Sequence, residues 1–500
     1  MRNAGFWQNV DVWEPGEISE AGISGAGTGM VWQPFGVTAP TTDDEGSERT
    51  AVAARVRYIV RGADVVTMND ARTVVSDGAV AIAGDRIVAV AAFAALRRDH
   101  PMAEVIGDGT GIVTPGYVNA HQHLTGDRLI QSCIPDAIDS QEAIFGWAVP
   151  VHGAHTGDDD ELSAMLGSIA AVTNGITCTV EAGTVAHPER VAAGIGAVGM
   201  RATLGQWGWD AEGVPFGAPV DEVLARQSAQ LDAMPAGGLV EGWVTLVGHD
   251  LMSDELAAGA SQLARRRGVG ITFHISPHSG DAVSYLTRTG RRPLDHLARL
   301  GVLGHHVLLA HAVHLDQGEL DLAIENDVAI ASCPWAYLRL AQGFVMNQRH
   351  GEFMARGGRL AVGCDAENAG DAVDVLRAAA LLVGVIRDSA SDPFAVTADD
   401  ALALATIRGA RAIGKGHSIG SIEVGKQADL VVHSTRGPQF TPRGTDPVRQ
   451  MVWASDGRSV EHVVVAGRHV VRDGRCVTVD LESLREEARS RRDRLVQAHG

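Results

Sequence analysis

Residues 114–124 read TPGYVNAHQHL, an apolar stretch that ends in two histidines, His121 and His123. On a β-strand, side chains two positions apart point to the same side. Both imidazoles are therefore expected to face one cavity from the end of this strand. An HxH pair alone does not define a metal site, but a third imidazole and a carboxylate would complete one that suits Zn²⁺ or Fe²⁺.

Seven more stretches have the apolar pattern of strands, and helical stretches lie between most of them. The eight candidates are 116–124, 176–183, 201–209, 243–250, 270–276, 307–315, 328–335 and 359–367. Eight strands that alternate with helices over residues 116–412 predict an α/β fold, a (β/α)8 TIM barrel. A doubly wound sheet is the alternative, but the eight repeats and the polar residues at so many strand ends favour the barrel.

The two ends of the chain have a different pattern of apolar residues. Residues 51–115 and 413–480 show period-two alternation with Gly-Asp turns, which predicts antiparallel sheets. We expect them to form one small β-sandwich domain built from both chain ends. Residues 481–500 predict a charged C-terminal helix. Residues 1–50, rich in Gly, Pro, Thr and acids, predict an N-terminal arm that either docks on a neighbouring subunit or is a mobile tail.

Composition excludes several classes of function. The 500 residues carry a formal net charge of −19, which repels phosphate backbones and argues against a nucleic-acid partner. No apolar run approaches the roughly 20 residues of a membrane helix, and the first residues carry acids where a signal peptide needs an apolar stretch. We therefore expect a cytoplasmic protein with no membrane partner. The five cysteines form no CxxC, so neither disulfides nor a thiolate zinc site is predicted.

In a barrel of this kind, functional side chains stand at the C-terminal ends of the strands. His249 ends the fourth candidate strand, His274 the fifth, His311 the sixth and Asp365 the eighth. Their occurrence at matching places argues against coincidental core histidines. With the HxH pair they supply imidazole and carboxylate ligands for a divalent metal.

The third and seventh candidate strands end in residues suited to substrate binding, namely Gln206, Trp207 and Trp335. Aromatic walls would suit a planar heterocycle, which stacks well on such rings. The alternative is that the two tryptophans only pack loops over the barrel.

The motifs resemble those of the amidohydrolase superfamily. TPGYVNAHQHL resembles its first barrel strand, usually P-G-[FL]-[VI]-[ND]-x-H-x-H, and LLAHAVHLDQGEL, ASCPWAYLRL and LAVGCDAEN resemble its sixth-, seventh- and eighth-strand motifs. GSIEVGKQADLVV resembles the turn by which such chains return to their β-sandwich. The resemblance covers residues 55–480 and is nearest to metal-dependent deaminases and triazine hydrolases, which act on purines, pyrimidines, pterins, S-adenosylhomocysteine and s-triazines.

The resemblance implies roles for five residues. His121, His123, His274 and Asp365 would bind one metal ion, and His311 would hydrogen-bond the water that the metal holds. A divalent metal lowers the pKa of its water from about 15.7 towards 7. Asp365 would take the proton of that water, and His311 would stabilise the negative oxygen that forms during attack.

The lysine content favours a single metal ion. Binuclear members of the superfamily generally bridge two metals with a carboxylated lysine on the fourth strand. The only lysines here are Lys415 and Lys426, both beyond the predicted barrel. One divalent ion, Zn²⁺ or alternatively Fe²⁺, is therefore predicted, unless a glutamate or cysteine bridges two.

Two positions depart from the pattern of the branch. Its deaminases usually place a glutamate three residues after the fifth-strand histidine, where it shuttles protons to the leaving amine, but this chain has Pro277. His278, His249 and Glu367 are the candidate replacements, although His278 could also be a solvent-exposed loop residue. The seventh-strand motif C-P-x-S-N is CPWAY at 333–337. Both positions handle substrate in the branch, so we expect an unusual substrate.

Together these features predict a metal-dependent hydrolase that acts on a C–N bond, other than a peptide bond, of a small molecule. Deamination of a heteroaromatic or amidine carbon with release of ammonia is the main hypothesis. One alternative within the fold is opening of a cyclic amide, or displacement of halide or alkylamine as in triazine hydrolases. A non-catalytic barrel that binds a ligand is the alternative of another class. By analogy with the branch, a homo-oligomer, dimer or larger, is expected.

Overall fold

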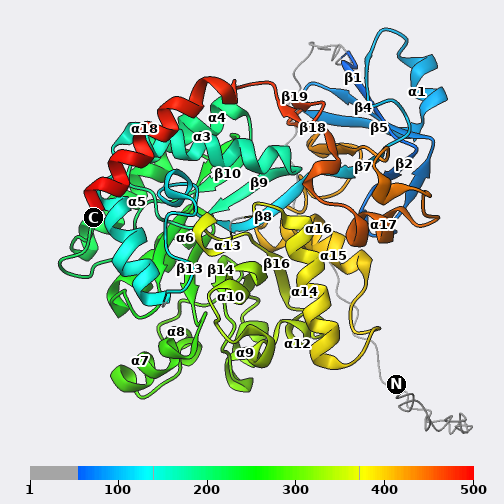
Figure 1. Cartoon of the computed structure of the whole chain (residues 1–500). Helices are drawn as coiled ribbons and strands as arrows, with labels where there is room; N and C mark the ends of the chain where they lie inside the picture. The colour runs from blue at the N-terminus through cyan, green and yellow to red at the C-terminus, as the bar shows by residue number, and fades with distance from the viewer. Residues whose placement is uncertain (1–54, 139, 371, 500) are drawn as a thin grey trace, which may run out of the picture. The chain divides into compact units, whose positions relative to one another are not determined.

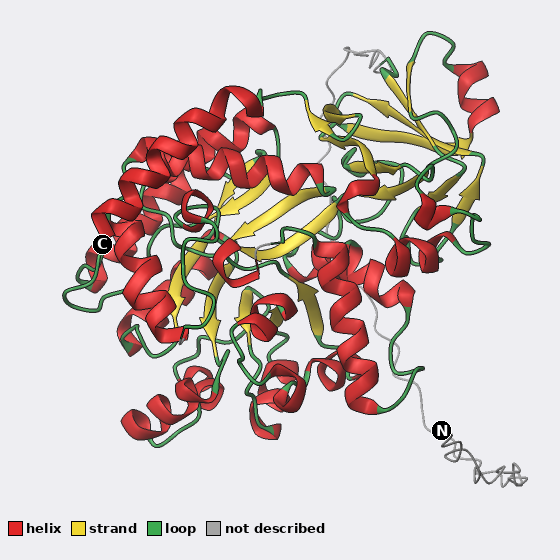
Figure 2. Ribbon diagram, viewed as in Figure 1, coloured by secondary structure: helices red, strands yellow, loops and turns green. Residues whose placement is uncertain are grey.

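The computed structural model describes residues 55–138, 140–370 and 372–499. Figure 2 shows parallel strands at the centre of the molecule with helices around them. In chain order these strands are β8 (Tyr117–Gln122), β9 (Ile176–Glu181), β10 (Arg201–Leu204), β11 (Val240–Gly242), β12 (Val244–Gly248), β13 (Ile271–Ile275), β14 (Val307–His311), β15 (Ala329–Ser332) and β16 (Arg359–Val362). All of them except β11 fall on the predicted stretches, so the predicted α/β fold with parallel strands is confirmed.

The central strands form two sheets, ordered β11-β10-β9-β8 and β12-β13-β14-β15-β16. Neighbours in both sheets pair in parallel. Backbone hydrogen bonds also join one sheet to the other at both sides. The N–H of Trp243 donates to the carbonyl of Leu204 at 2.9 Å, and the N–H of Cys364 donates to the carbonyl of His121 at 3.0 Å.

Helices connect these strands, and side-chain caps determine where several of them begin. Thr156 and Asp316 each form a reciprocal capping box with the acidic residue three positions on, because the first turn leaves backbone N–H groups without partners. The connecting helices are α3 (Gly157–Thr173), α4 (Pro188–Val198), α5 (Val220–Ala233), α6 (Asp254–Arg267), α7 (Ser279–Thr289), α8 (Pro293–Arg299), α9 (Gln317–Glu325), α10 (Pro334–Arg339), α11 (Phe344–Asn347), α12 (His350–Ala355), α13 (Glu367–Gly370), α14 (Val375–Ala390), α15 (Ala398–Ala405) and α16 (Ile407–Ala412).

Both chain ends contribute to two further sheets, ordered β5-β4-β1-β6 and β20-β19-β18-β17-β7-β2-β3. Strand β17 pairs antiparallel with β7, so the ends of the chain meet in one sheet. Apolar side chains of both sheets share one buried cluster that includes Val60, Ile82, Val113 and Leu430. The strands are β1 (Tyr58–Arg61), β2 (Asp64–Val66), β3 (Val74–Ser76), β4 (Gly78–Ala83), β5 (Arg86–Ala92), β6 (Glu104–Ile106), β7 (Ile112–Pro115), β17 (Leu430–His433), β18 (Val460–Val465), β19 (Arg468–Arg472) and β20 (Arg475–Cys476), and the helices beside them are α1 (Phe93–Asp99), η3 (Pro438–Phe440), α17 (Pro447–Ala454) and η4 (Gly457–Ser459).

Short helices follow β8, and the C-terminal helix packs against them. They are η1 (Asp127–Ile130), η2 (Glu142–Ala148) and α2 (Val149–Gly153), and the C-terminal helix is α18 (Leu481–His499). Leu495 of α18 is buried in one cluster with Ile130 and Ala143. Arg491 of α18 also forms an ion pair with the buried Asp159 of α3, at 3.0 Å. The C-terminal helix therefore supports the segment that follows β8 (Figure 1).

The predicted arm at residues 1–50 lies outside the described residues. Within the described ranges, no helix combines the length and the apolar character needed to cross a bilayer.

Candidate metal centre and active site

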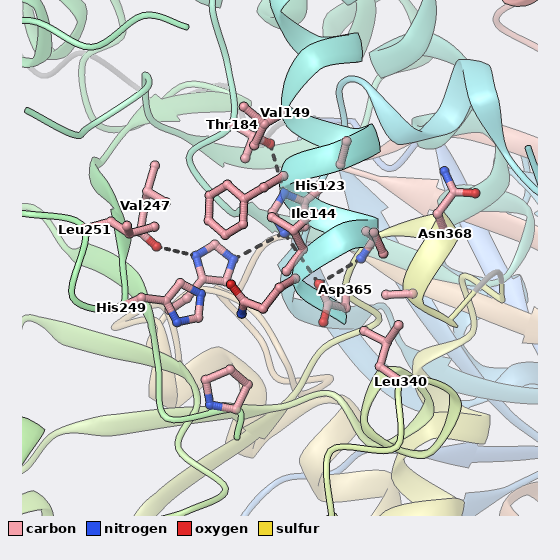
Figure 3. Close-up of a pocket in the computed structure, with 18 of the residues that line it drawn as sticks. His123, Ile144, Val149, Thr184, Val247, His249, Leu251, Leu340, Asp365 and Asn368 are labelled. Atoms are coloured by element: carbon pink, nitrogen blue, oxygen red, sulfur yellow. Dashed lines mark hydrogen bonds and ion pairs between the residues drawn. The ribbon is translucent and has the colours of Figure 1, made fainter. Parts of the chain in front are cut away.

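Side chains from four strand ends meet at one place. Figure 3 labels two of them, His123 and Asp365. His121 lies in β8 and His123 follows that strand, while His274 lies in β13 and His311 ends β14. Asp365 follows β16, where its N–H donates to the carbonyl of His121 at 3.0 Å. The parallel strands thus bring the five residues of the predicted metal site together although these residues span positions 121 to 365 of the chain.

The nitrogen atoms of the first three histidines form a compact donor set. Ring nitrogens of His121, His123 and His274 lie within 4.8 Å of one another. The carboxylate oxygen Oδ1 of Asp365 lies 3.6 Å from Nε2 of His121 and 3.5 Å from Nε2 of His123. Three imidazoles and one carboxylate are the N/O ligands expected for Zn²⁺ and related divalent ions.

Hydrogen bonds on the far side of two rings determine which nitrogen faces the centre. Nδ1 of His274 lies 2.7 Å from the carbonyl of Val247, so it must donate. Nδ1 of His123 lies 2.9 Å from the hydroxyl of Thr184, which itself donates to Glu181 at 3.3 Å, so this Nδ1 also donates. Such outer contacts are typical of histidines that bind metals through Nε2.

The remaining nitrogens lack a protein partner that could satisfy them. Nε2 of His274 and Nε2 of His123 face each other at 3.2 Å, and with both Nδ1 atoms protonated each presents a lone pair. Both ring nitrogens of the fully buried His121 have no hydrogen-bond partner. A shared cation would satisfy these atoms, so the residues present fit a divalent metal.

The electrostatics of the site also suit a cation. Burial lowers the pKa of His274 well below its usual value, and the neighbouring imidazoles lower it further, so this ring is neutral and able to bind a metal. Burial would raise the pKa of Asp365, but the neighbouring imidazoles of His121, His123 and His311 outweigh it and hold that pKa well below its usual range. The site therefore combines a neutral imidazole, that of His274, with an ionised carboxylate.

His311 lies beside the donor set and is not part of it. Its Nδ1 is buried without a hydrogen-bond partner and lies 4.0 Å from Oδ2 of Asp365. Burial lowers the pKa of His311 to about 3, which leaves the ring neutral. One nitrogen of a neutral ring carries a proton and can donate it to an oxygen in the site.

The ring of His249 is oriented by the buried carboxylate of Asp281, a partner that no sequence pattern indicated. Nδ1 of His249 lies 2.9 Å from Oδ2 of Asp281, which also accepts the N–H of Ser276 at 2.7 Å. The ring of His249 stacks on His274 with centroids 5.5 Å apart. The pair is 32 residues apart in sequence, so no local pattern could have predicted it.

Three of these residues adopt a backbone conformation that is rare outside glycine. The φ angles are 53° for His249, 74° for His311 and 64° for Asp365. Left-handed conformations cost free energy for such residues and persist where the surrounding structure imposes them. Each side chain is thereby turned toward the centre at the point where its strand ends.

These residues border a cavity of about 270 Å³. Its wall is mostly apolar and comes largely from the segment after β8, from Ile134, Ala143, Ile144, Phe145, Ala148 and Val149. Trp207 completes it from the third strand and stacks on Trp209 with ring centroids 5.0 Å apart. Among the described residues, no lysine or arginine lines the cavity.

The other predicted site residues have different positions. His278 lines the cavity, and its Nδ1 accepts the N–H of Gly280 at the start of α7. Gln206 does not line it; its side-chain nitrogen lies 3.5 Å from the carbonyl of Ala186. Trp335 lines a separate groove instead. Strand-end position alone could not distinguish side chains that enter the cavity from those that turn away.

Glu367 is buried outside the cavity lining, and both its carboxylate oxygens lack hydrogen bonds. Burial raises the pKa of Glu367 from 4.5 to about 7, against the attraction of Arg128, which lies 3.6 Å away. Between pH 4.5 and about 7, Glu367 therefore keeps its proton in the folded protein, whereas the unfolded chain loses it. Stability from this group is present at low pH and is lost as pH approaches 7.

Glu367→Gln is therefore expected to stabilise the protein at about pH 8.5 by roughly 3 kcal/mol, and much less at about pH 5.5. Denaturant unfolding of both proteins at the two pH values measures this. Because Glu367 lies outside the cavity lining, we also expect kcat to change by less than about tenfold. A larger loss of kcat would place Glu367 in the reaction.

The sequence of the chain identifies its family. Residues 112–470 match the sequence model of the amidohydrolase family. The chain belongs to the amidohydrolase family. It is therefore an enzyme, a metal-dependent amidohydrolase, and the family predicted from its motifs is confirmed. A shorter stretch, residues 78–101, matches an imidazolonepropionase-like composite domain of bacteria.

Similar proteins in this family include named deaminases. The chain is 30% identical over 450 residues to a 5-methylthioadenosine/S-adenosylhomocysteine deaminase of Pelotomaculum thermopropionicum, covering 88% of this chain and 98% of that protein. It is 29% identical over 414 residues to the enzyme of that name from Syntrophobacter fumaroxidans, covering 82% of this chain and 92% of that protein.

Solved structures of similar fold also include zinc proteins. An adenosine deaminase of Xanthomonas campestris with bound zinc superposes with a TM-score of 0.83 at 26% identity, covering 89% of this chain and 99% of that one. Atrazine chlorohydrolase of Arthrobacter aurescens, complexed with zinc and atraton, shares the fold with a TM-score of 0.80 at 22% identity, covering 87% of this chain and 100% of that one.

Proposed function

We propose that the protein removes an amino group from a neutral heteroaromatic molecule by hydrolysis, using one divalent metal ion. The observation that carries the proposal is the donor set of three imidazoles and a carboxylate at the floor of an apolar cavity. The deaminases among the similar proteins support the leaving group.

The finer architecture is part of the proposal. Backbone hydrogen bonds join the two central sheets at both sides, which supports a closed (β/α)8 barrel over residues 116–412. The apolar cluster shared by the two other sheets supports a β-sandwich of residues 51–115 and 413–480. In such a barrel the catalytic groups lie at the C-terminal ends of the strands, which is where the donor set lies.

We assign the metal to His121, His123, His274 and Asp365, with Zn²⁺ preferred and Fe²⁺ as the alternative. A single ion is supported by the absence of lysine before Lys415. The thiol of Cys333 lies near His121 and Asp365, but burial raises its pKa well above the usual value, so the thiolate that metals prefer is disfavoured. Zinc is favoured because the adenosine deaminase of similar structure holds it.

Each residue of the site has a distinct part in the reaction. A bound divalent ion lowers the pKa of water towards 7 and so supplies the nucleophile. Asp365 accepts a proton at Oδ2, and His311 donates a hydrogen bond to the negative oxygen that develops on the substrate carbon. The Nδ1–H of His249 is donated to Asp281, so its Nε2 is the nitrogen that can take up one of the protons lost by the attacking water and pass it to the leaving amine.

The cavity also limits the substrate. Trp207 offers a flat apolar wall for a heteroaromatic ring, and the segment around Ile144 encloses the rest of the molecule. A substituent with an unpaired negative charge would be buried without a basic partner, which is costly. Neutral substrates are therefore expected to react with a kcat/KM at least about 100-fold above that of carboxylate-bearing analogues.

Ammonia release is the test of this proposal. The zinc-loaded protein is assayed with purines, pterins, pyrimidines, nucleosides and triazines, each as a neutral compound and as a carboxylate-bearing analogue. We expect release that chelation abolishes and that is faster with the neutral member of a pair. Metal-loaded protein that releases no ammonia from any compound would contradict deamination.

A different leaving group is the second candidate. Pro277, which lines the cavity, stands where deaminases of this branch usually carry a glutamate. Leaving groups such as halide need no proton from that position. Halide or alkylamine release from triazines in the same assay would favour this candidate.

A further inference from the structure

A second cavity lies at the opposite end of the central strands from the metal centre. It has a volume of about 830 Å³ and is bordered by residues at or just before the beginnings of β10, β13 and β14. His274 and His311 of the metal centre lie instead at the other ends of β13 and β14. The two cavities share no lining residue, so the second one is separate from the reaction.

The lining of this second cavity is basic, although the chain as a whole carries a formal net charge of −19. Nζ of Lys415, one of the two lysines in the chain, lies 2.6 Å from Oε2 of Glu241, so these two charges offset each other. Glu241 is the one carboxylate among the described lining residues. Four side chains that are positively charged at neutral pH line the cavity, namely Arg86, Arg201, Arg265 and Lys415.

The three arginines differ in how far the protein itself neutralises them. Nε of Arg201 lies 2.7 Å from Oδ2 of the buried Asp429, and Arg86 has a more distant surface carboxylate 3.7 Å away. Arg265, near the end of α6, forms no ion pair within the described part of the chain. Its Nη2 donates to the carbonyl of Leu303 at 2.9 Å. The remaining N–H groups of this guanidinium can therefore bind an anion through parallel hydrogen bonds.

A recess beside Arg265 provides space for such an anion. A Cβ atom added at Gly304 would lie 3.3 Å from Nη2 of Arg265 and 3.1 Å from Nδ1 of His306. Glycine at this position therefore keeps the space between the two side chains open. Nε2 of His306 lies 2.9 Å from Oγ of Ser261, which orients the ring with Nδ1 beside the recess.

Apolar side chains form much of the remaining lining. Trp243 is only 7% exposed and lines the cavity. Its indole packs against Gly270, where an added Cβ atom would come within 2.5 Å of the ring. Val269, Ile413 and Ile419 line the cavity as well. This surface suits the apolar or aromatic body of a small organic molecule.

We propose that this second cavity binds a small organic anion, whose phosphate or carboxylate group pairs with Arg265 and whose apolar body packs beside Trp243. The basic lining attracts such a molecule although the chain as a whole is acidic. Among the described residues, no lysine or arginine lines the cavity at the metal centre. The two cavities therefore select ligands of different charge.

Isothermal titration calorimetry of the metal-loaded protein tests the proposal with phenyl phosphate, benzoate and the neutral benzyl alcohol. We expect at least one of the two anions to bind at one site per chain, and benzyl alcohol to bind at least about tenfold more weakly. Arg265→Glu is expected to weaken binding of the anion at least about tenfold, because it reverses the charge that pairs with the ligand. Since an anion could also bind the metal, this variant assigns the binding to the second cavity.

Two further variants complete the experiment. Arg266→Glu makes the same charge change at an exposed neighbour in α6 that does not line the cavity, and it should leave the dissociation constant unchanged. Ala236→Trp places an indole at the exposed rim and should weaken binding without reversing a charge. Thermal melting of each variant separates a lost contact from misfolding. The proposal is overturned if neither anion binds, if benzyl alcohol binds as tightly as the anions, or if folded Arg265→Glu binds as tightly as Arg266→Glu.

Discussion

Asp365→Asn is expected to lower kcat by about 10³- to 10⁴-fold while the metal remains bound. Oδ1 of this carboxylate lies beside His121, which belongs to the donor set, and its Oδ2 lies beside His311. An amide keeps an oxygen for the metal but cannot accept a proton. Asparagine also tolerates the left-handed φ of 64° at this position, so the backbone should not change.

The measurement combines steady-state kinetics with the metal content of each protein. Asp327→Asn is the matched control, because Asp327 has a φ of 51° but lies on the surface with a side chain 58% exposed. The control should keep wild-type kcat. Full turnover by Asp365→Asn with metal bound would remove Asp365 from the proton transfer and leave it as a ligand only.

His249→Asn is expected to lower kcat by about 10²- to 10³-fold with little change in metal content. Nδ1 of His249 is held by the buried carboxylate of Asp281, which orients the imidazole in the cavity. Pro277, which also lines the cavity, has no group that can transfer a proton. Asp281→Asn keeps the imidazole but loses its ionised partner. A loss of about 10- to 100-fold is expected for that variant, as for other residues that position a catalytic group.

His278→Asn provides the comparison. It removes another histidine that lines the cavity, while asparagine can still accept the N–H of Gly280 and cap α7. We expect less than about a tenfold change in kcat. If His278→Asn is the more damaging variant, the proton is carried by His278 and the pair of His249 and Asp281 has only a structural part.

Much of the fold could be predicted because its signals are local. The apolar runs that end in polar residues predicted the parallel strands, since a strand buried on both faces needs a continuous apolar sequence. The prediction of the fourth strand was less accurate. The predicted stretch 243–250 corresponds to β12 (Val244–Gly248), and a further short strand, β11 (Val240–Gly242), precedes it. The chain passes from one sheet to the other at Trp243, between these two strands. The hydrogen bond of Trp243 to another strand has no local signal.

The site was predictable as far as strand ends define it. Convergence of the C-terminal strand ends follows from the fold, so His121, His123, His274, His311 and Asp365 could be found from position alone. The same rule selected Gln206 and Trp335, which turn away from the cavity. Position at a strand end predicts where a residue lies, but the backbone angles and the neighbouring residues determine the direction of its side chain.

By itself the sequence determined the family, the residue types at the candidate metal centre, the absence of lysine before Lys415 and the presence of Pro277 in place of the usual glutamate. Each of these is a property of the linear chain. The tertiary structure alone decided which nitrogens face the centre, that Asp281 holds His249, and that Glu367 lies outside the cavity lining. It also placed Trp335 beside α14. These are contacts between residues distant in sequence, and their geometry depends on how the strands and helices pack.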